Sequence, residues 1–261
     1  MILVTGAGGN VGSELTRILA RDGHSVRALV RTPRPLPDGV EGVMGDLNEP
    51  TSLKTALDDV RAVFLLGGYA DLPGALAVMR DADVEQVTLL SSRSVVGGHS
   101  GNTVAGTHLA AEASVRASEL AWTFLRPSGF MSNTLRWVPQ LRAGDVVREP
   151  FANVPVATID PYDIAAVAAE SLTTPGHEGR AYAITGPGSL RPGDRLRVLG
   201  ELLGRELRLE PLPDAESRVT TSPEMPEEFD DSVVTGAVQD LTGRAPRPFA
   251  DWARTHLGAF R

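Results

Sequence analysis

The first twelve residues, MILVTGAGGNVG, constrain the fold more than any other stretch of the chain. A short apolar run from Ile2 to Val4 stops at a glycine-rich turn. The turn opens into a helical spacing of apolar residues at Val11, Leu15 and Ile18. Strand, tight turn and helix in this order form the unit that places a pyrophosphate at a helix N-terminus. The sequence therefore predicts a dinucleotide-binding α/β fold.

The glycines of this turn are spaced Gly-x-x-Gly-x-x-Gly. We expect Gly6 to let the chain turn, Gly9 to let backbone N–H groups approach the phosphates, and Gly12 to let the helix pack close to the strand. The alternative is an ordinary tight turn without a ligand. The loop residues predicted to bind the cofactor are Thr5, Gly6, Gly9, Asn10, Val11 and Gly12.

Strands and helices alternate through the first two thirds of the chain. This alternation predicts right-handed βαβ units and a doubly wound, Rossmann-type parallel sheet that is covered on both faces. The predicted strands are Ile2–Thr5, Ser25–Arg31, Val43–Met44, Ala62–Leu66, Gln86–Ser91 and Trp122–Arg126. The predicted helices between them are Val11–Asp22, Pro50–Leu57, Leu72–Ala82 and Val104–Ser118.

The pattern changes after Arg126, so we expect a nucleotide-binding core over residues 1–126 and a smaller, mainly helical substrate lobe over 127–261. Residues 154–186 are expected to return to the sheet. The elements predicted in this part are strands Val154–Ile159, Ala181–Thr185 and Glu206–Glu210, and helices Pro161–Leu172, Pro192–Leu203, Pro226–Thr242 and Pro248–Phe260.

Composition excludes several classes of function. A net charge of −8 over 261 residues argues against nucleic acids and anionic membranes as partners. No apolar run is long enough to cross a bilayer, and the glycines interrupt any leader-like start. The absence of cysteine excludes disulfides and thiolate metal sites, and the histidines lack metal-ligand spacing, so no metal is expected. These features predict a soluble cytoplasmic protein.

Two arginines follow the second predicted strand, where an NAD-specific fold usually carries an acid that binds the ribose. Arg31 and Arg34 can instead clamp a 2′-phosphate with charged hydrogen bonds, so we expect NADP(H) rather than NAD(H). The alternative is that both are solvated loop charges.

Further cofactor contacts are expected after the next three strands. Asp46 can accept a hydrogen bond from the adenine amino group, or can start the next helix instead. Leu47 can pack on the adenine ring, and small residues after the fourth strand permit close approach of a ribose. The predicted set is Asp46, Leu47, Leu66, Gly67, Gly68 and Ser91.

Together these residues resemble the short-chain dehydrogenase/reductase superfamily, and more narrowly its atypical NmrA-like branch. The resemblance covers nearly the whole chain. It implies either an NADPH-dependent reductase of quinones, triphenylmethane dyes or phenylpropanoids, or a non-catalytic nucleotide-sensing regulator; dimers are common in related proteins, so a homodimer is compatible with it. The segments that carry it are the glycine loop, VRALVR (26–31), GDL (45–47), SS (91–92), HLAAE (108–112), WTFLRP (122–127), FMSN (130–133), DPYDIA (160–165) and LTGRAPRPFADW (241–252).

The superfamily's catalytic Tyr, with a Lys four residues later, is absent. The chain has one lysine, Lys54, and none of Tyr69, Tyr162 and Tyr182 has a lysine at the fourth following position. This argues against simple alcohol–ketone interconversion. Quinone reduction needs less help from a protein acid, because the hydroquinone anion is delocalised and water can supply its proton. The missing pair is therefore more compatible with hydride delivery to quinones, conjugated acceptors or cationic dyes.

The comparable helix carries His108 and Glu112, which share one face at i, i+4 spacing. We expect Glu112 to orient and charge the imidazole, His108 to donate a proton, and Ser92 to hydrogen-bond the substrate carbonyl. The alternative is that His108 packs beside the cofactor and Glu112 secures a loop.

Phe130 and Met131 are expected to form an apolar wall of the substrate site, Asn133 to fix a polar substituent, and Trp137 to contribute. Core packing between sheet and lobe is the alternative role. The sequence thus predicts an NADPH-dependent reductase of a small aromatic, quinonoid or conjugated carbonyl substrate. Two alternative functions are a non-catalytic NADP(H) sensor and an NADP-dependent isomerase or epimerase.

Overall fold

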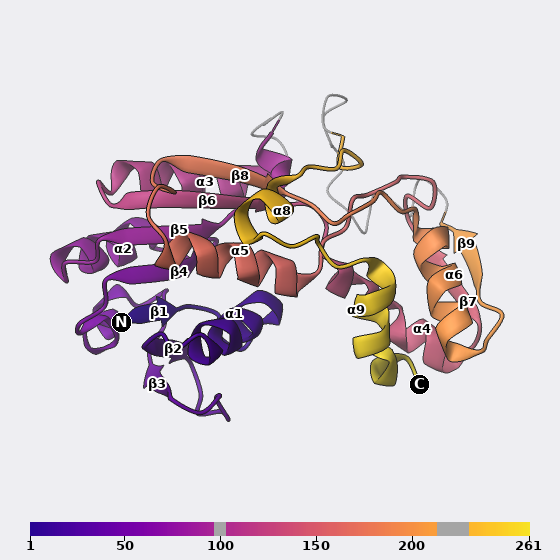
Figure 1. Cartoon of the computed structure of the whole chain (residues 1–261), viewed down its shortest axis with the longest axis horizontal. Coiled ribbons are helices and arrows are strands. Elements are labelled where there is room, and N and C mark those ends of the chain that lie inside the picture. The colour runs from indigo at the N-terminus through magenta and orange to yellow at the C-terminus, as the bar shows by residue number, and fades with distance from the viewer. Residues whose placement is uncertain (97–102, 213–229) are drawn as a thin grey trace.

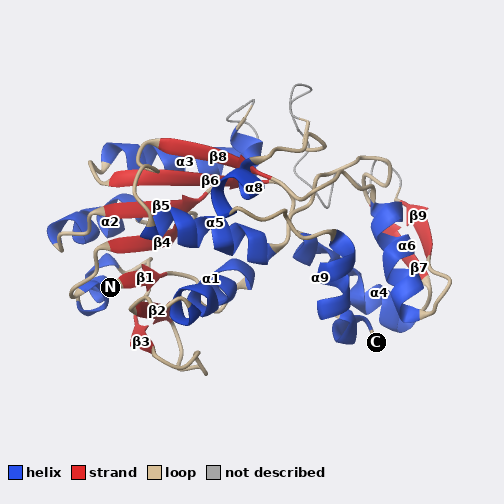
Figure 2. Ribbon diagram, viewed as in Figure 1, coloured by secondary structure: helices blue, strands red, loops and turns tan. Residues whose placement is uncertain are grey.

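A seven-stranded parallel sheet forms the larger part of the molecule (Figures 1 and 2). The computed structural model describes residues 1–96, 103–212 and 230–261. The strand order is β3-β2-β1-β4-β5-β6-β8, and every neighbouring pair runs parallel. The strands are β1 (Ile2–Val4), β2 (Val26–Val30), β3 (Val40–Met44), β4 (Ala62–Leu66), β5 (Gln86–Leu90), β6 (Ala121–Pro127) and β8 (Arg180–Ile184).

The order reverses at β1, whose Val4 pairs with Ala28 of β2 on one side and Phe64 of β4 on the other. From β1, strands β2 and β3 extend the sheet in one direction, and strands β4, β5, β6 and β8 extend it in the other. In open α/β sheets, ligands bind beyond the carboxyl ends of the strands at such a switch point. The glycine turn follows β1 at this position.

Helices cover both faces of the sheet, as apolar parallel strands require. On one face, α1 (Asn10–Arg21) packs against α5 (Pro161–Thr173), with α8 (Ala237–Thr242) beside α5. The other face is covered by α2 (Leu72–Asp81) and α3 (Thr103–Ala117), together with the short 3₁₀ turns η1 (Pro50–Leu53) and η2 (Thr55–Leu57). The predicted helix Pro50–Leu57 is thus two 3₁₀ turns.

A second, smaller region has its own core around Trp137, Trp252 and Phe260, and Figure 1 shows it to one side of the sheet. Within it β7 (Val146–Glu149) and β9 (Arg208–Pro211) form a two-stranded parallel sheet. Its elements are η4 (Met131–Trp137), α4 (Val138–Ala143), β7 (Val146–Glu149), α6 (Pro192–Leu203), β9 (Arg208–Pro211), α9 (Phe249–Thr255) and η5 (Leu257–Phe260). The sequence reading missed η4, α4 and β7.

The predicted strand Val154–Ile159 is wrong. Pro155 has no N–H to donate, and this segment makes only isolated bridges, Phe130 with Ile159 and Val156 with Leu190. It is a connection tied to several neighbours rather than a member of either sheet. The first part of the predicted helix Pro226–Thr242 lies outside the described residues, and the described helix there is α8.

No helix among the described residues is long and apolar enough to cross a membrane.

Candidate active site and cofactor groove

The turn between β1 and α1 is built on two glycines. Gly6 has a φ of +61°, and the N–H of Gly9 donates to its carbonyl oxygen at 2.8 Å. A Cβ on Gly12 would meet the Gly6 carbonyl group and lie 3.0 Å from Cα of Ala7. Because both neighbours are backbone, the helix can approach the turn only with glycine at position 12.

Beyond this turn lies a cavity of about 480 Å³, which we call the glycine-loop cavity. The loop after β2 brings Arg31 and Arg34 to it, and a Cβ on Gly8 would collide with the Arg34 guanidinium, so that side chain lies directly over the glycine loop. Neither arginine has an ion-pair partner among the described residues. The residues that line the glycine-loop cavity are Gly6–Gly9, Leu29–Thr32, Arg34, Gly45–Leu47, Leu66 and Tyr69.

Seven of the predicted cofactor residues line this cavity: Gly6, Gly9, Arg31, Arg34, Asp46, Leu47 and Leu66. The Asp46 carboxylate also closes a turn, because it accepts hydrogen bonds from N and Nδ2 of Asn48 at 2.9 and 3.1 Å. Tyr69 was missed by the sequence reading. It is half-buried in the cavity wall, where burial raises the pKa of its phenol.

Other predicted cofactor residues lie behind the glycine-loop cavity or beside it. Thr5 is buried and its hydroxyl accepts a hydrogen bond from the N–H of Leu66 at 3.1 Å, which joins the ends of β1 and β4. Asn10 donates from Nδ2 to Oγ of Ser132 at 3.1 Å and so links α1 to η4. Val11, Gly12 and Gly68 are not among the residues that line the cavity.

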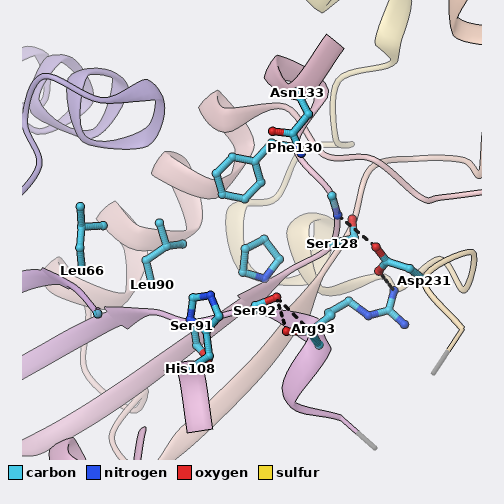
Figure 3. A pocket seen from close by; sticks show the side chains of 14 residues that line it. Leu66, Leu90, Ser91, Ser92, Arg93, His108, Ser128, Phe130, Asn133 and Asp231 are labelled. Atoms are coloured by element: carbon cyan, nitrogen blue, oxygen red, sulfur yellow. Dashed lines mark hydrogen bonds and ion pairs between the residues drawn. The ribbon is translucent and has the colours of Figure 1, made fainter. Parts of the chain in front are cut away.

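A second cavity of about 490 Å³, the His108 cavity, lies at the carboxyl ends of β5 and β6 (Figure 3). Leu66 lines both cavities, so the two adjoin at the end of β4. The predicted site residues that line it are Leu66, Gly67, Ser91, Ser92, His108, Phe130 and Asn133.

His108 projects from α3 into this cavity (Figure 3). Its Nδ1 is buried and has no hydrogen-bond partner in the part of the chain that the structure describes. Burial lowers the pKa of the imidazole, and the charge of Glu112 only partly opposes this. His108 is therefore mainly neutral near pH 7, contrary to the expectation that Glu112 would charge it.

Glu112 does not orient His108 directly, which corrects the predicted role. Its carboxylate is fully buried, does not line the cavity, and is used by other groups. Arg126 donates to it from Nε and Nη2 at 2.8 and 2.6 Å, and Ser91 donates from Oγ at 2.7 Å. Burial disfavours the charged form, but these hydrogen bonds and the charges of Arg126 and Arg116 together lower the pKa of Glu112. Glu112 thus ties α3 to the ends of β5 and β6, one turn from His108.

Met131 and Trp137 do not form a wall of the His108 cavity. Both are buried in the core of the smaller region, and Nε1 of Trp137 donates to Glu149 at 2.6 Å. Phe130 and Asn133, at the start of the same segment, do line the cavity. The packing alternative therefore describes Met131 and Trp137, and the substrate-wall prediction for them is wrong.

The far end of the cavity contains a pair of charged side chains that the sequence reading missed, Arg93 and Asp231 (Figure 3). Arg93 Nη1 lies 3.6 Å from Oδ1 of Asp231, and the N–H of Gly129 donates to Oδ2 at 3.2 Å. Burial raises the pKa of Asp231 to about 6. No motif marks this pair, since the two residues are far apart in sequence and only the fold joins them.

Comparisons with a protein family and with individual known proteins indicate the same family for this chain. A family described as NAD(P)H-binding matches residues 6–175. The chain is 39% identical to a (4-alkanoyl-5-oxo-2,5-dihydrofuran-3-yl)methyl phosphate reductase from Streptomyces griseus, over 100% of this chain and 99% of the relative. It is 32% identical to an NAD(P)H azoreductase from Xenophilus azovorans, again over 100% and 99%.

Among solved structures, the triphenylmethane reductase of a Citrobacter species superposes with a TM-score of 0.82 at 21% identity, covering 98% of this chain and 99% of that one. A quinone oxidoreductase from Escherichia coli gives 0.79 at 20% identity, with the same coverage. These two similarities concern the fold. Taken with the family match and the full-length relatives, they show that the chain belongs to the NAD(P)H-binding, NmrA-like branch of the atypical short-chain dehydrogenases/reductases and is an NAD(P)H-dependent oxidoreductase.

Proposed function

We propose that the chain is an NADPH-dependent reductase of a small conjugated carbonyl, quinonoid or aromatic acceptor. The observation that carries this proposal is that the two cavities adjoin at Leu66. The glycine-loop cavity has the cations and close backbone approach that a dinucleotide requires. The His108 cavity next to it combines apolar walls with a few polar groups, as small-molecule sites do.

The preference for NADPH is assigned to Arg31 and Arg34. Both guanidinium groups are exposed at the edge of the glycine-loop cavity and free of carboxylate partners among the described residues. A 2′-phosphate would accept charge-assisted hydrogen bonds from them, whereas the ribose of NADH offers no charge to pair with.

In the His108 cavity we assign a role to each of four residues. NADPH, when bound, supplies the hydride that reduces the acceptor. The Ser92 hydroxyl, which lines the cavity, would donate to the acceptor's carbonyl oxygen, and Phe130 would offer an aromatic face to a flat acceptor. Asn133 would orient a polar substituent. His108, whose imidazole lines the cavity, would hydrogen-bond the acceptor or relay a proton from water.

A conjugated acceptor suits a site with a mainly neutral imidazole. The anion left after hydride addition to a quinone is delocalised, so water can protonate it without a strong acid from the protein. The enolate left by an enone is more basic and would gain more from a proton relayed by His108. The name of the Streptomyces griseus relative describes such a substrate, a dihydrofuranone carrying an alkanoyl group, and the second relative reduces azo compounds by its name. Both support a conjugated acceptor here.

We further assign residues 1–126 to nucleotide binding and residues 127–261 to a substrate lobe, with α5 and β8 contributed back to the sheet. On this assignment Phe130 and Asn133 stand where the chain leaves the sheet for the lobe.

The test is NADPH oxidation by the purified protein with naphthoquinones, dihydrofuranones and azo and triphenylmethane dyes, beside direct measurement of NADPH binding. Turnover of any acceptor class supports the reductase. Tight NADPH binding without turnover of any acceptor would contradict the proposal and favour the nucleotide sensor.

A further inference from the structure

The Asp231 carboxyl group stands at the far end of the His108 cavity (Figure 3). Its side chain is only 16% exposed. Oδ1 is shielded from solvent, lies 3.6 Å from Nη1 of Arg93 and has no hydrogen-bond partner among the described residues. Oδ2 accepts a single hydrogen bond, from the N–H of Gly129. Because a carboxylate oxygen can accept more than one hydrogen bond, Oδ2 keeps acceptor capacity that a ligand in the cavity can use.

The segment around Asp231 is held firmly in place. Arg93 donates from Nη1 to the carbonyl of Val233 at 2.8 Å and from Nη2 to the carbonyl of Asp230 at 3.0 Å. The N–H of Ala157 donates to the Asp231 carbonyl oxygen at 2.8 Å, and the Thr235 hydroxyl donates to Ala183 at 2.7 Å. The carboxyl group is therefore a preorganised part of the cavity wall.

Arg93 does not supply a free cation for an anionic ligand. Its side chain is 10% exposed, and its guanidinium donates to two backbone carbonyls and faces the Asp231 carboxylate. An anion entering this end of the cavity would approach Asp231 and would have to displace contacts that hold the segment. A hydroxyl, an amino group or a positive charge would instead meet an open acceptor.

We propose that Asp231 is a specificity-determining residue, which selects acceptors that present a hydrogen-bond donor or a positive charge at this end of the cavity and rejects acceptors that present an anion. This inference rests on the proposed reductase function. It predicts that the chain prefers a hydroxymethyl dihydrofuranone to the corresponding phosphate ester, the kind of compound for which the Streptomyces griseus relative is named.

The charge state of Asp231 gives the selection a pH dependence. Since burial raises the pKa of Asp231 to about 6, it is charged near neutral pH and becomes neutral as the pH falls below that value. The charged and titratable groups around it are Arg93 from the turn after β5, Asp230 beside it, and His108 from α3 across the cavity. Discrimination against anions should therefore weaken below about pH 6.

The experiment compares two matched acceptor pairs, a hydroxymethyl dihydrofuranone with its phosphate, and a naphthoquinone with its sulfonate. The proteins are the wild type, Asp231→Asn, Asp231→Glu and Asp230→Asn, where Asp230 is an exposed neighbour whose carboxylate bonds to Ser232. The wild type should favour the uncharged member of each pair. Asp231→Asn should reduce that preference by about tenfold, mainly through KM. Asp231→Glu and Asp230→Asn should retain it.

A second readout separates this inference from the proposed function. The dissociation constants of the same compounds are measured by calorimetry on protein saturated with NADP⁺. If nothing turns over, the reductase proposal fails, while a charge preference in binding that disappears in Asp231→Asn still supports the role of Asp231. Equal preference in wild type and Asp231→Asn in both readouts, or a wild type that binds neither member of either pair, overturns it.

Discussion

Replacing Glu112 by glutamine should destabilise the fold more than any exposed charge change. The Glu112 carboxylate is fully buried and receives hydrogen bonds from Arg126, Ser91 and Arg116. Arg126 is 22% exposed and Arg116 is 46% exposed, so most of the loss comes from Arg126. Removing one partner of a buried ion pair costs about 3–5 kcal/mol, and we expect the lower end because Arg126 retains some solvent.

The effect should depend on pH with a definite sign. Because the pKa of Glu112 is lowered in the folded state, its stabilisation is complete above the unfolded value of about 4.3 and is lost as pH falls through the folded value. The difference in unfolding free energy between wild type and Glu112→Gln should therefore be constant near neutral pH and shrink in acid.

Urea denaturation followed by tryptophan fluorescence measures both effects. The matched control is Glu201→Gln, which removes an exposed helical pair with Arg197 and should cost less than about 0.5 kcal/mol. A Glu112→Gln cost of less than about 1 kcal/mol, or one equal to the control, would refute the argument that this buried network anchors α3.

Three further predictions concern the cofactor and the chemistry. Gly12→Ala should abolish NADPH binding in calorimetry, because its Cβ meets the Gly6 carbonyl, while circular dichroism still shows a folded sheet; unchanged affinity would contradict the turn geometry. Arg31→Ala should weaken NADPH binding by about tenfold and leave NADH binding unchanged. An unaltered ratio of NADPH to NADH affinity would show that Arg31 does not bind the 2′-phosphate. His108→Ala should slow the reduction of an enone by about a hundredfold but that of a quinone much less, since the hydroquinone anion needs no proton from the protein; equal losses would argue against this.

The parts of the fold that local chemistry dictates were predictable from the sequence. The glycine turn after Val4 and the alternation of buried strands with helices indicate the parallel sheet directly, and the structure confirms it. The strand predicted at Val154–Ile159 failed because its apolar residues serve connections to three different segments, which no local pattern reveals.

In the candidate site too, features set by local sequence were predictable, and features set by tertiary contacts were not. Residues that directly follow strands, such as Ser92, could be placed at the sheet edge from the strand pattern alone. Whether Met131 and Trp137 face the cavity or the core depends on the 3₁₀ geometry of η4, which the sequence reading did not foresee. Asp231 joins the cavity through long-range contacts with Arg93 and Gly129, residues 138 and 102 positions earlier (231 − 93 and 231 − 129).

The most direct test of the account is a single assay of the purified protein with NADPH, in which a naphthoquinone and a hydroxymethyl dihydrofuranone are offered as acceptors. The account predicts acceptor-dependent oxidation of NADPH, faster than with NADH at equal concentration, and loss of this oxidation in Gly12→Ala. NADPH binding with no oxidation in the presence of either acceptor, or an equal rate with NADH, would contradict it.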